Sequence, residues 1–138
     1  MKLWITNLEL SDIVRQKAGI RFPIVFETID SKTLSIGVEI NTLVRKKVVS
    51  IPVTIVSISG TKIHLNCTSG SAKLDFAISF LCNAIPSLRN KLYMLDIQGS
   101  QILVHLDKIE QAKKALEYIS IQDISFVEDK LDVDFVLR

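Results

Sequence analysis

The sequence predicts an α+β fold in which a curved, mainly antiparallel sheet wraps around a central apolar helix, with two further helices beside it. The helix is expected over residues 71–85, where apolar side chains cover nearly the whole circumference and only Asp75, Ser79 and Asn83 form a narrow polar stripe. Several other segments alternate apolar and polar residues, which is typical of strands that bury one face. A helix that is apolar on almost every side needs cover, so we expect the strands to surround it.

Length and composition indicate a single domain spanning residues 1–138. A chain of 138 residues can bury a core large enough to fold without a disulfide or a metal. Its hydrophobic content is 48% but only 7% is aromatic, so the surplus is aliphatic and favours strands. No apolar run approaches the roughly 18 residues of a membrane span, and the first residues lack the features of a signal peptide. We therefore expect a cytoplasmic protein, unless the chain is a trimmed secreted one.

The first half of the chain is predicted to form one helix and a four-strand meander. Thr6 and Glu9 match a capping box, and the apolar stripe that follows ends at Gly19. Trp4 is expected to anchor the start of this helix against the core. Pro52 cannot donate a ladder hydrogen bond, so its strand is expected at a sheet edge or a bulge. The predicted strands cover residues 22–29, 33–45, 47–58 and 62–68.

The second half is predicted to contain two hairpins separated by a helix. Gly99-Ser100 is a favourable turn pair for the first hairpin, and Asp107-x-x-Glu110 is typical of a helix start. The predicted elements are a hairpin over 92–98 and 101–107, a helix over 107–119, and a closing hairpin over 122–128 and 130–137.

No residue pattern indicates catalysis, a metal or a cofactor. His64 and His105 each lie within a predicted strand, without a second histidine or a cysteine at ligand spacing. Cys67 and Cys82 fall in apolar rows, which predicts buried free thiols. The sequence has no glycine-rich phosphate loop, nucleophile elbow or zinc signature. We therefore expect no enzyme activity.

Charge is distributed unevenly along the chain, although the net charge is only +2. Residues 1–62 carry nine basic and five acidic side chains, whereas residues 115–138 carry six acidic and two basic ones. Such a molecule is self-complementary, which is compatible with a homo-oligomer. The alternative is an ordinary solvated surface.

Arg45, Lys46 and Lys47 are adjacent at the predicted turn between two long strands. Each cation gains roughly 1 kcal/mol near an anionic lipid leaflet, which suits a transient membrane contact. The alternative is a solvated turn, where charged residues are common. Nucleic acid is not an expected partner, because no aromatic residues interleave with these charges.

Four segments carry a resemblance to a known family: TLSIGVEINTLVR, KVVSIPVTIVSI, LDFAISFLCNAI and ISIQDISFVEDKLDVDFVLR. In their order along the chain they resemble the tubular lipid-binding (TULIP) superfamily. In that family a strongly curved antiparallel sheet rolls around a long helix and leaves an apolar groove for acyl chains, so the resemblance implies this fold and a lipid ligand. The family has no invariant motif, and no functional residue is carried over from it. Cystatin-like and other folds with a helix on a curved sheet are the alternatives.

Together these observations predict a non-enzymatic binding protein for a lipid or another apolar small molecule. The helix and the strands supply more aliphatic surface than a two-layer core obviously uses, and each buried ligand methylene contributes about 0.8 kcal/mol. The alternative is a structural or protein–protein interaction module, a homo-oligomer without a ligand, whose apolar surplus is core and interface. The residues expected to line the groove are Phe76, Ile78, Phe80, Val53 and Ile55.

Overall fold

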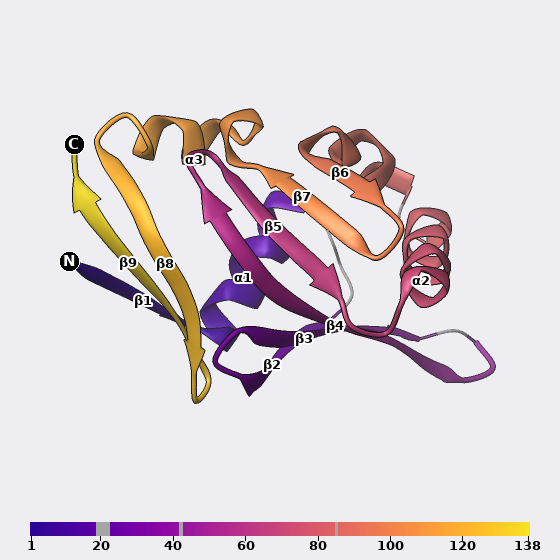
Figure 1. The fold of residues 1–138 in the computed structure, drawn as a ribbon. Helices are drawn as coiled ribbons and strands as arrows, with labels where there is room; N and C mark the ends of the chain where they lie inside the picture. Colours follow the sequence, from indigo (N-terminus) through magenta and orange to yellow (C-terminus); the bar gives the residue numbers. More distant parts are fainter. Residues whose placement is uncertain (19–22, 42, 85) are drawn as a thin grey trace.

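The computed structural model describes residues 1–18, 23–41, 43–84 and 86–138. Within these residues the strands form two separate antiparallel sheets, and helices pack beside them (Figure 1). The α+β class and the antiparallel pairing predicted from sequence are therefore confirmed. Both chain ends lie at the smaller sheet, at the left of Figure 1.

The larger sheet contains the predicted meander. Its four consecutive strands pair in chain order, and the hairpin that turns at Gly99 extends the sheet through its second strand. Gly99 has a φ of 62°, in the left-handed region that a tight turn of this kind requires. In spatial order the strands are β2 (Ile24–Asp30), β3 (Thr33–Asn41), β4 (Lys46–Ser59), β5 (Lys62–Cys67), β7 (Gln101–His105) and β6 (Leu95–Gln98).

The smaller sheet has the order β1 (Lys2–Thr6), β9 (Lys130–Leu137), β8 (Ile119–Val127). The closing hairpin was predicted, but β1 was not. Trp4 pairs with Asp132 in this sheet and is 55% exposed, with the Lys130 ammonium 4.3 Å from its ring centroid. The prediction that Trp4 anchors the core is therefore wrong, because strand pairing with β9 places its ring at the surface under a cation.

Helix α1 (Asn7–Ala18) begins with the predicted capping box. The Glu9 amide donates to the Thr6 hydroxyl oxygen (3.1 Å), and that hydroxyl donates to the Glu9 carboxylate (2.9 Å). The buried face differs from the predicted stripe, because Asn7 and Ser11 are buried while Ile13 is exposed. The Asn7 side-chain nitrogen donates to the Thr28 hydroxyl on β2 (3.2 Å), while the Asn7 Oδ1 is buried without a hydrogen-bond partner among the described residues.

Helix α2 (Ser71–Ala84) packs on one face of the larger sheet, and the 3₁₀ helix η1 (Pro86–Met94) follows it in the chain. Its inner face buries Leu74, Ala77 and Cys82, but Phe76 is 60% exposed. The sheets are not closed, and α2 lies toward one end of the molecule (Figure 1). The predicted wrapping of the sheet around a central helix is therefore not confirmed.

The predicted helix over 107–119 is shorter and broken. Residues Leu106–Lys108 form a 3₁₀ turn (η2), Glu110–Ala115 form α3, and Ile119 already belongs to β8. Neither η2 nor α3 has a buried residue, so little packing stabilises this helical stretch. Pairing of Ile119 with Leu137 in the sheet ends it instead.

Strand β4 changes its neighbours at Pro52. Its pairing with β3 runs along the strand from Lys46 to Thr54, whereas its pairing with β5 begins at Val53. The Pro52 carbonyl accepts a bond from the Thr68 amide (3.3 Å), where β5 has just ended. In the described pairings β4 is therefore paired on one side only before Pro52, with β3, and on both sides at Val53 and Thr54. Beyond Thr54 it pairs with β5.

One part of the core lies between the larger sheet and α2, and further buried residues lie on β2, β3 and β8, such as Ile24, Val38 and Phe126. The buried centre of the part beside α2 is formed by Val53, Cys67, Leu74 and Ile102, and neighbouring aliphatic side chains pack around them. Cys67 and Cys82 are both buried and free, as predicted.

Contacts between the two sheets centre on the turn between β2 and β3. Phe126 in β8 donates its amide to the Ser31 carbonyl (2.9 Å), and the Lys32 ammonium donates to the Asp123 carboxylate (2.6 Å) and the Ile124 carbonyl (2.7 Å). The hydrogen bond from Lys32 holds the pKa of Asp123 below its ordinary value. Lys32 thus joins one sheet to the other.

Candidate functional site

The residues predicted to line a groove lie at different depths in the structure. Val53 is part of the buried core and Ile78 packs against it, while Ile55 is half-buried further along β4. Phe76 and Phe80 lie on α2, where Phe76 is exposed and Phe80 is half-buried. The five residues therefore divide into a core set and a surface set.

Phe76 and Phe80 form a stacked aromatic pair on α2. Their ring centroids are 6.2 Å apart and their planes differ by 23°. A spacing of four residues places them one turn apart on the same side of the helix. The inner side of α2 buries Leu74 and Ala77, whereas Phe76 in this second apolar row is 60% exposed and can contact another molecule.

The tip of the hairpin between β3 and β4, residues 43–46, is the most exposed apolar point among the described residues. Leu43 has 108% of its reference area exposed and Val44 has 92%. The sequence predicted that Val44 belongs to a strand over residues 33–45, but β3 ends at Asn41 and β4 begins at Lys46. Val44 is therefore at the turn and not in the core.

The cations predicted to contact a membrane lie at this same tip. Arg45 and Lys46 are exposed, and the Lys46 ammonium pairs with the Glu39 carboxylate at 3.0 Å. The side chain of Lys47 lies outside the described residues. Sequence reasoning found these cations but missed Leu43 and Val44, although an apolar pair directly before three cations was a usable signal.

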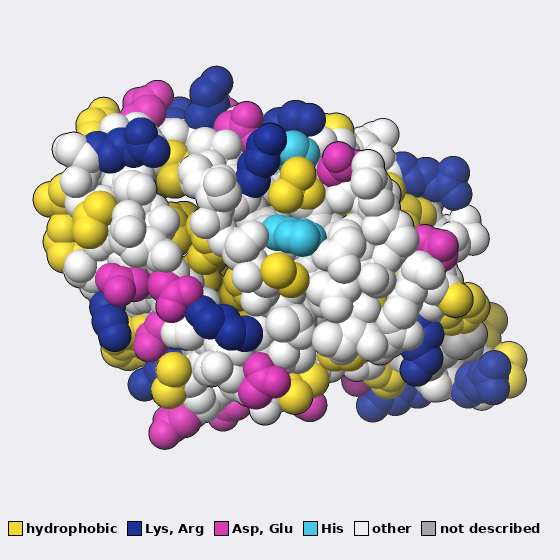
Figure 2. All heavy atoms as spheres, in the orientation of Figure 1, with side chains coloured by type: hydrophobic (Ala, Val, Ile, Leu, Met, Phe, Trp, Pro, Cys, Tyr) yellow, Lys and Arg dark blue, Asp and Glu magenta, His cyan; other side chains and the backbone are white. Residues whose placement is uncertain are grey.

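Helix α2 and the hairpin tip occupy the same end of the molecule. In Figure 1 the hairpin extends past α2 at the right, and contacts between α2 and β4 link the two elements. Figure 2 shows dark blue and yellow side chains together at the lower right, where the hairpin lies. Apolar and cationic groups are thus displayed side by side at this end.

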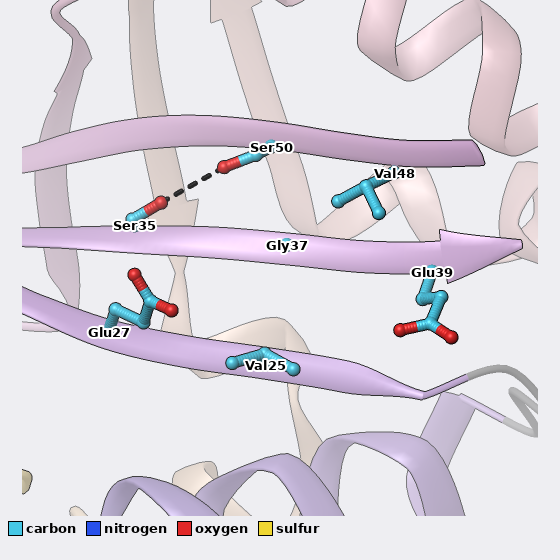
Figure 3. A pocket seen from close by; sticks show the side chains of 7 residues that line it. All are labelled: Val25, Glu27, Ser35, Gly37, Glu39, Val48 and Ser50. Atoms are coloured by element: carbon cyan, nitrogen blue, oxygen red, sulfur yellow. Dashed lines mark hydrogen bonds between the residues drawn. The ribbon is translucent and has the colours of Figure 1, made fainter. Parts of the chain in front are cut away.

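The opposite face of the larger sheet carries a shallow hollow of about 170 Å³ (Figure 3). Glu27 and Glu39 stand toward its two ends, and the Ser35 and Ser50 hydroxyls are hydrogen-bonded across it (3.1 Å). The hollow is smaller than the roughly 300 Å³ of a typical small-molecule pocket. Glu39 already pairs with Lys46, and the Ser35 hydroxyl is already hydrogen-bonded to Ser50.

A second hollow on this face is lined by His64, Asp96, Gln98, Gln101 and Leu103. The Gln101 amide nitrogen donates to the Asn66 side-chain oxygen (2.8 Å), so the Gln101 oxygen faces the His64 Nε2. The His64 Nε2 is thus engaged by Gln101. In the described part of the chain no group of three or more His, Cys, Asp or Glu side chains is arranged to hold a metal.

No helix in the described ranges combines the length and the apolar composition needed to cross a bilayer. Comparisons of the chain with protein-family models, curated proteins and solved structures found no match.

Proposed function

We propose that the chain is a non-enzymatic lipid-binding protein that holds an acyl chain against the second apolar row of α2. The observation that supports it is the ring of Phe76, which is 60% exposed and stacks on Phe80, although the same helix buries Leu74 and Ala77 on its inner face. An apolar ligand would bury these rings, and each of its methylenes would contribute about 0.8 kcal/mol.

The proposal includes a ligand-bound form in which the larger sheet wraps around α2. If the sheet curves further around α2 when ligand is bound, Ile55 and Ile78 would line the groove together with the aromatic pair. Val53 would form its floor, since it is already buried under α2. A ligand of this kind requires no ionic partner in the groove, because its affinity comes from buried apolar area.

The test is native mass spectrometry of the protein purified from cells, followed by organic extraction and identification of any bound lipid. We expect a co-purified lipid in the wild-type protein and a marked loss in Phe76→Ser. Tyr118→Ser is the matched control, because Tyr118 is an exposed aromatic residue outside α2. Absence of lipid from the wild type, or equal loss in both variants, would contradict the proposal.

A second candidate is an interaction module that pairs with a second copy along β4. The edge of β4 before Pro52 is supported by β3 alone in the described pairings, and such an edge can accept another strand. Light scattering at low salt should then show a dimer. Ser50→Pro should abolish it, because the Ser50 amide points to the open side of the strand. A monomer at high concentration would exclude this candidate.

A further inference from the structure

We propose that the tip of the β3–β4 hairpin, residues 43–46, docks the protein onto an anionic lipid bilayer. This surface is distinct from the acyl-chain site on α2 and would act whether or not that site holds a ligand. Leu43 and Val44 would enter the boundary between headgroups and acyl chains, while Arg45 and Lys46 would meet anionic headgroups.

The exposure of the tip is the first observation. Leu43 and Val44 have 108% and 92% of their reference areas exposed, so they bury almost no apolar surface in the folded chain. Scattered apolar surface residues are common, but two adjacent, almost fully solvated ones at the end of a projecting hairpin form a wedge (Figure 1). Val48, which pairs with Glu39 near this end of the hairpin, is also exposed and extends the apolar surface.

The charge next to the wedge is the second observation. Arg45 and Lys46 follow Val44 directly and are exposed. Anionic lipids attract such cations near the surface, and apolar insertion adds to that attraction. A lipid surface fits this combination better than a protein groove does, because it accepts the wedge and the cations at once without a matched shape.

Glu39 moderates the charge of the tip. Its carboxylate lies 3.0 Å from the Lys46 ammonium, so the pair must loosen or share its charge when Lys46 approaches a phosphate. Removing this carboxylate should therefore strengthen binding to anionic membranes. If the Glu39–Lys46 pair only stabilised the hairpin, removing the carboxylate would not strengthen membrane binding.

Insertion is expected to be shallow. A turn carries backbone polar groups that need water or headgroups as partners, so it does not enter the hydrocarbon region. With two apolar side chains and few cations, the contact should be reversible and sensitive to salt.

The experiment measures partition of the full chain onto two kinds of vesicle. One is phosphatidylcholine alone, and the other contains roughly 30% phosphatidylserine, which gives it a negative surface potential. The wild type should bind the anionic vesicles preferentially. The variant Leu43→Ser with Val44→Ser should lose about tenfold or more in partition coefficient. Arg45→Gln with Lys46→Gln should lose the preference for anionic lipid, and Glu39→Gln should bind about twofold to fivefold more tightly.

Matched controls lie elsewhere on the surface. Val127→Ser with Val136→Ser removes two exposed apolar side chains from the smaller sheet, and Lys113→Gln with Lys114→Gln removes two exposed cations from α3. Both should bind like the wild type. Equal binding to neutral and anionic vesicles, or wild-type binding by the Leu43 and Val44 variant, would overturn the proposal.

A second measurement reports on the tip directly. Trp4 is the only tryptophan of the chain, so Trp4→Phe combined with Val44→Trp places a single fluorophore at the tip. Its emission should shift to the blue on addition of anionic vesicles, and an unchanged spectrum would contradict insertion. Mass spectrometry of the Leu43 and Val44 variant separates the two lipid proposals, because acyl-chain occupancy on α2 should survive the loss of docking.

Discussion

Lys32 shows how a single side chain can couple two sheets. It follows the turn residue Ser31, and its own amide donates to the Asp30 carboxylate (2.9 Å), which lowers the pKa of Asp30 below its ordinary value. Its ammonium meanwhile spans to the other sheet, at Asp123 and the Ile124 carbonyl. The turn therefore orients the Lys32 side chain so that its ammonium joins the two sheets.

Replacing Lys32 by Met should destabilise the protein by about 1 to 2 kcal/mol. The hydrogen bond to Ile124 is worth about 1 kcal/mol, and the ion pair with Asp123 adds less than about 1 kcal/mol because both groups are partly exposed to solvent. Urea denaturation of both proteins at neutral pH measures the difference. Lys114→Met, which removes an exposed ion pair with Glu110, should cost under about 0.5 kcal/mol.

The pH dependence of this effect has a definite sign. The folded state lowers the pKa of Asp123 below its ordinary value of 3.8, so the folded protein binds fewer protons than the unfolded chain in that range. The stabilisation is thus fully present above the unfolded pKa and is lost as pH falls through the folded one. The difference between wild type and Lys32→Met should shrink in acid, and a difference that grows there would contradict the assignment.

Individual residues also show where sequence patterns stop being informative. Thr6 and Glu9 were correctly predicted to cap a helix, because the capping signal is local. Trp4 and Val44 were misplaced, because whether an apolar residue is buried depends on elements far away in the chain. The exposed wedge of the candidate docking site was missed for the same reason.

At the scale of elements, α2 divides into an inner and an outer apolar row. Its composition predicted a helix at the correct position, but a nearly complete apolar circumference was taken as evidence of burial on all sides. Only one side meets the sheet, since α2 packs at one end of the molecule. The number of layers that cover a helix is a tertiary property, which composition alone does not determine.

Truncating one side chain in each row should lower the free energy of unfolding by very different amounts. Leu74→Ala should destabilise the protein by about 2 to 5 kcal/mol, because Leu74 is 1% exposed and the cavity left behind cannot fill with water favourably. Phe76→Ala should cost under about 1 kcal/mol, since its ring is mostly solvated. Thermal and urea denaturation measure both, and comparable losses at the two positions would contradict the division into rows.

At the scale of the whole molecule, local pairings were more predictable than the assembly of sheets. The meander and both hairpins follow from alternation and turn residues. The pairing of β1 with β9 joins residues at opposite ends of the chain, such as Trp4 and Asp132, and no local pattern encodes it. The division into two sheets depends on such long-range pairings and was not predicted.

The change of neighbours at Pro52 has a consequence for amide hydrogen exchange along β4. The Ile55 amide donates to the Lys32 carbonyl (2.8 Å), so by alternation Val49 and Ile51 also direct their amides to β3. Val48 and Ser50 direct theirs to the side where β5 is absent. In deuterated buffer Val48 and Ser50 should exchange early, and Val49 and Ile51 late. Equal protection of these four amides would mean that another strand covers this edge in solution.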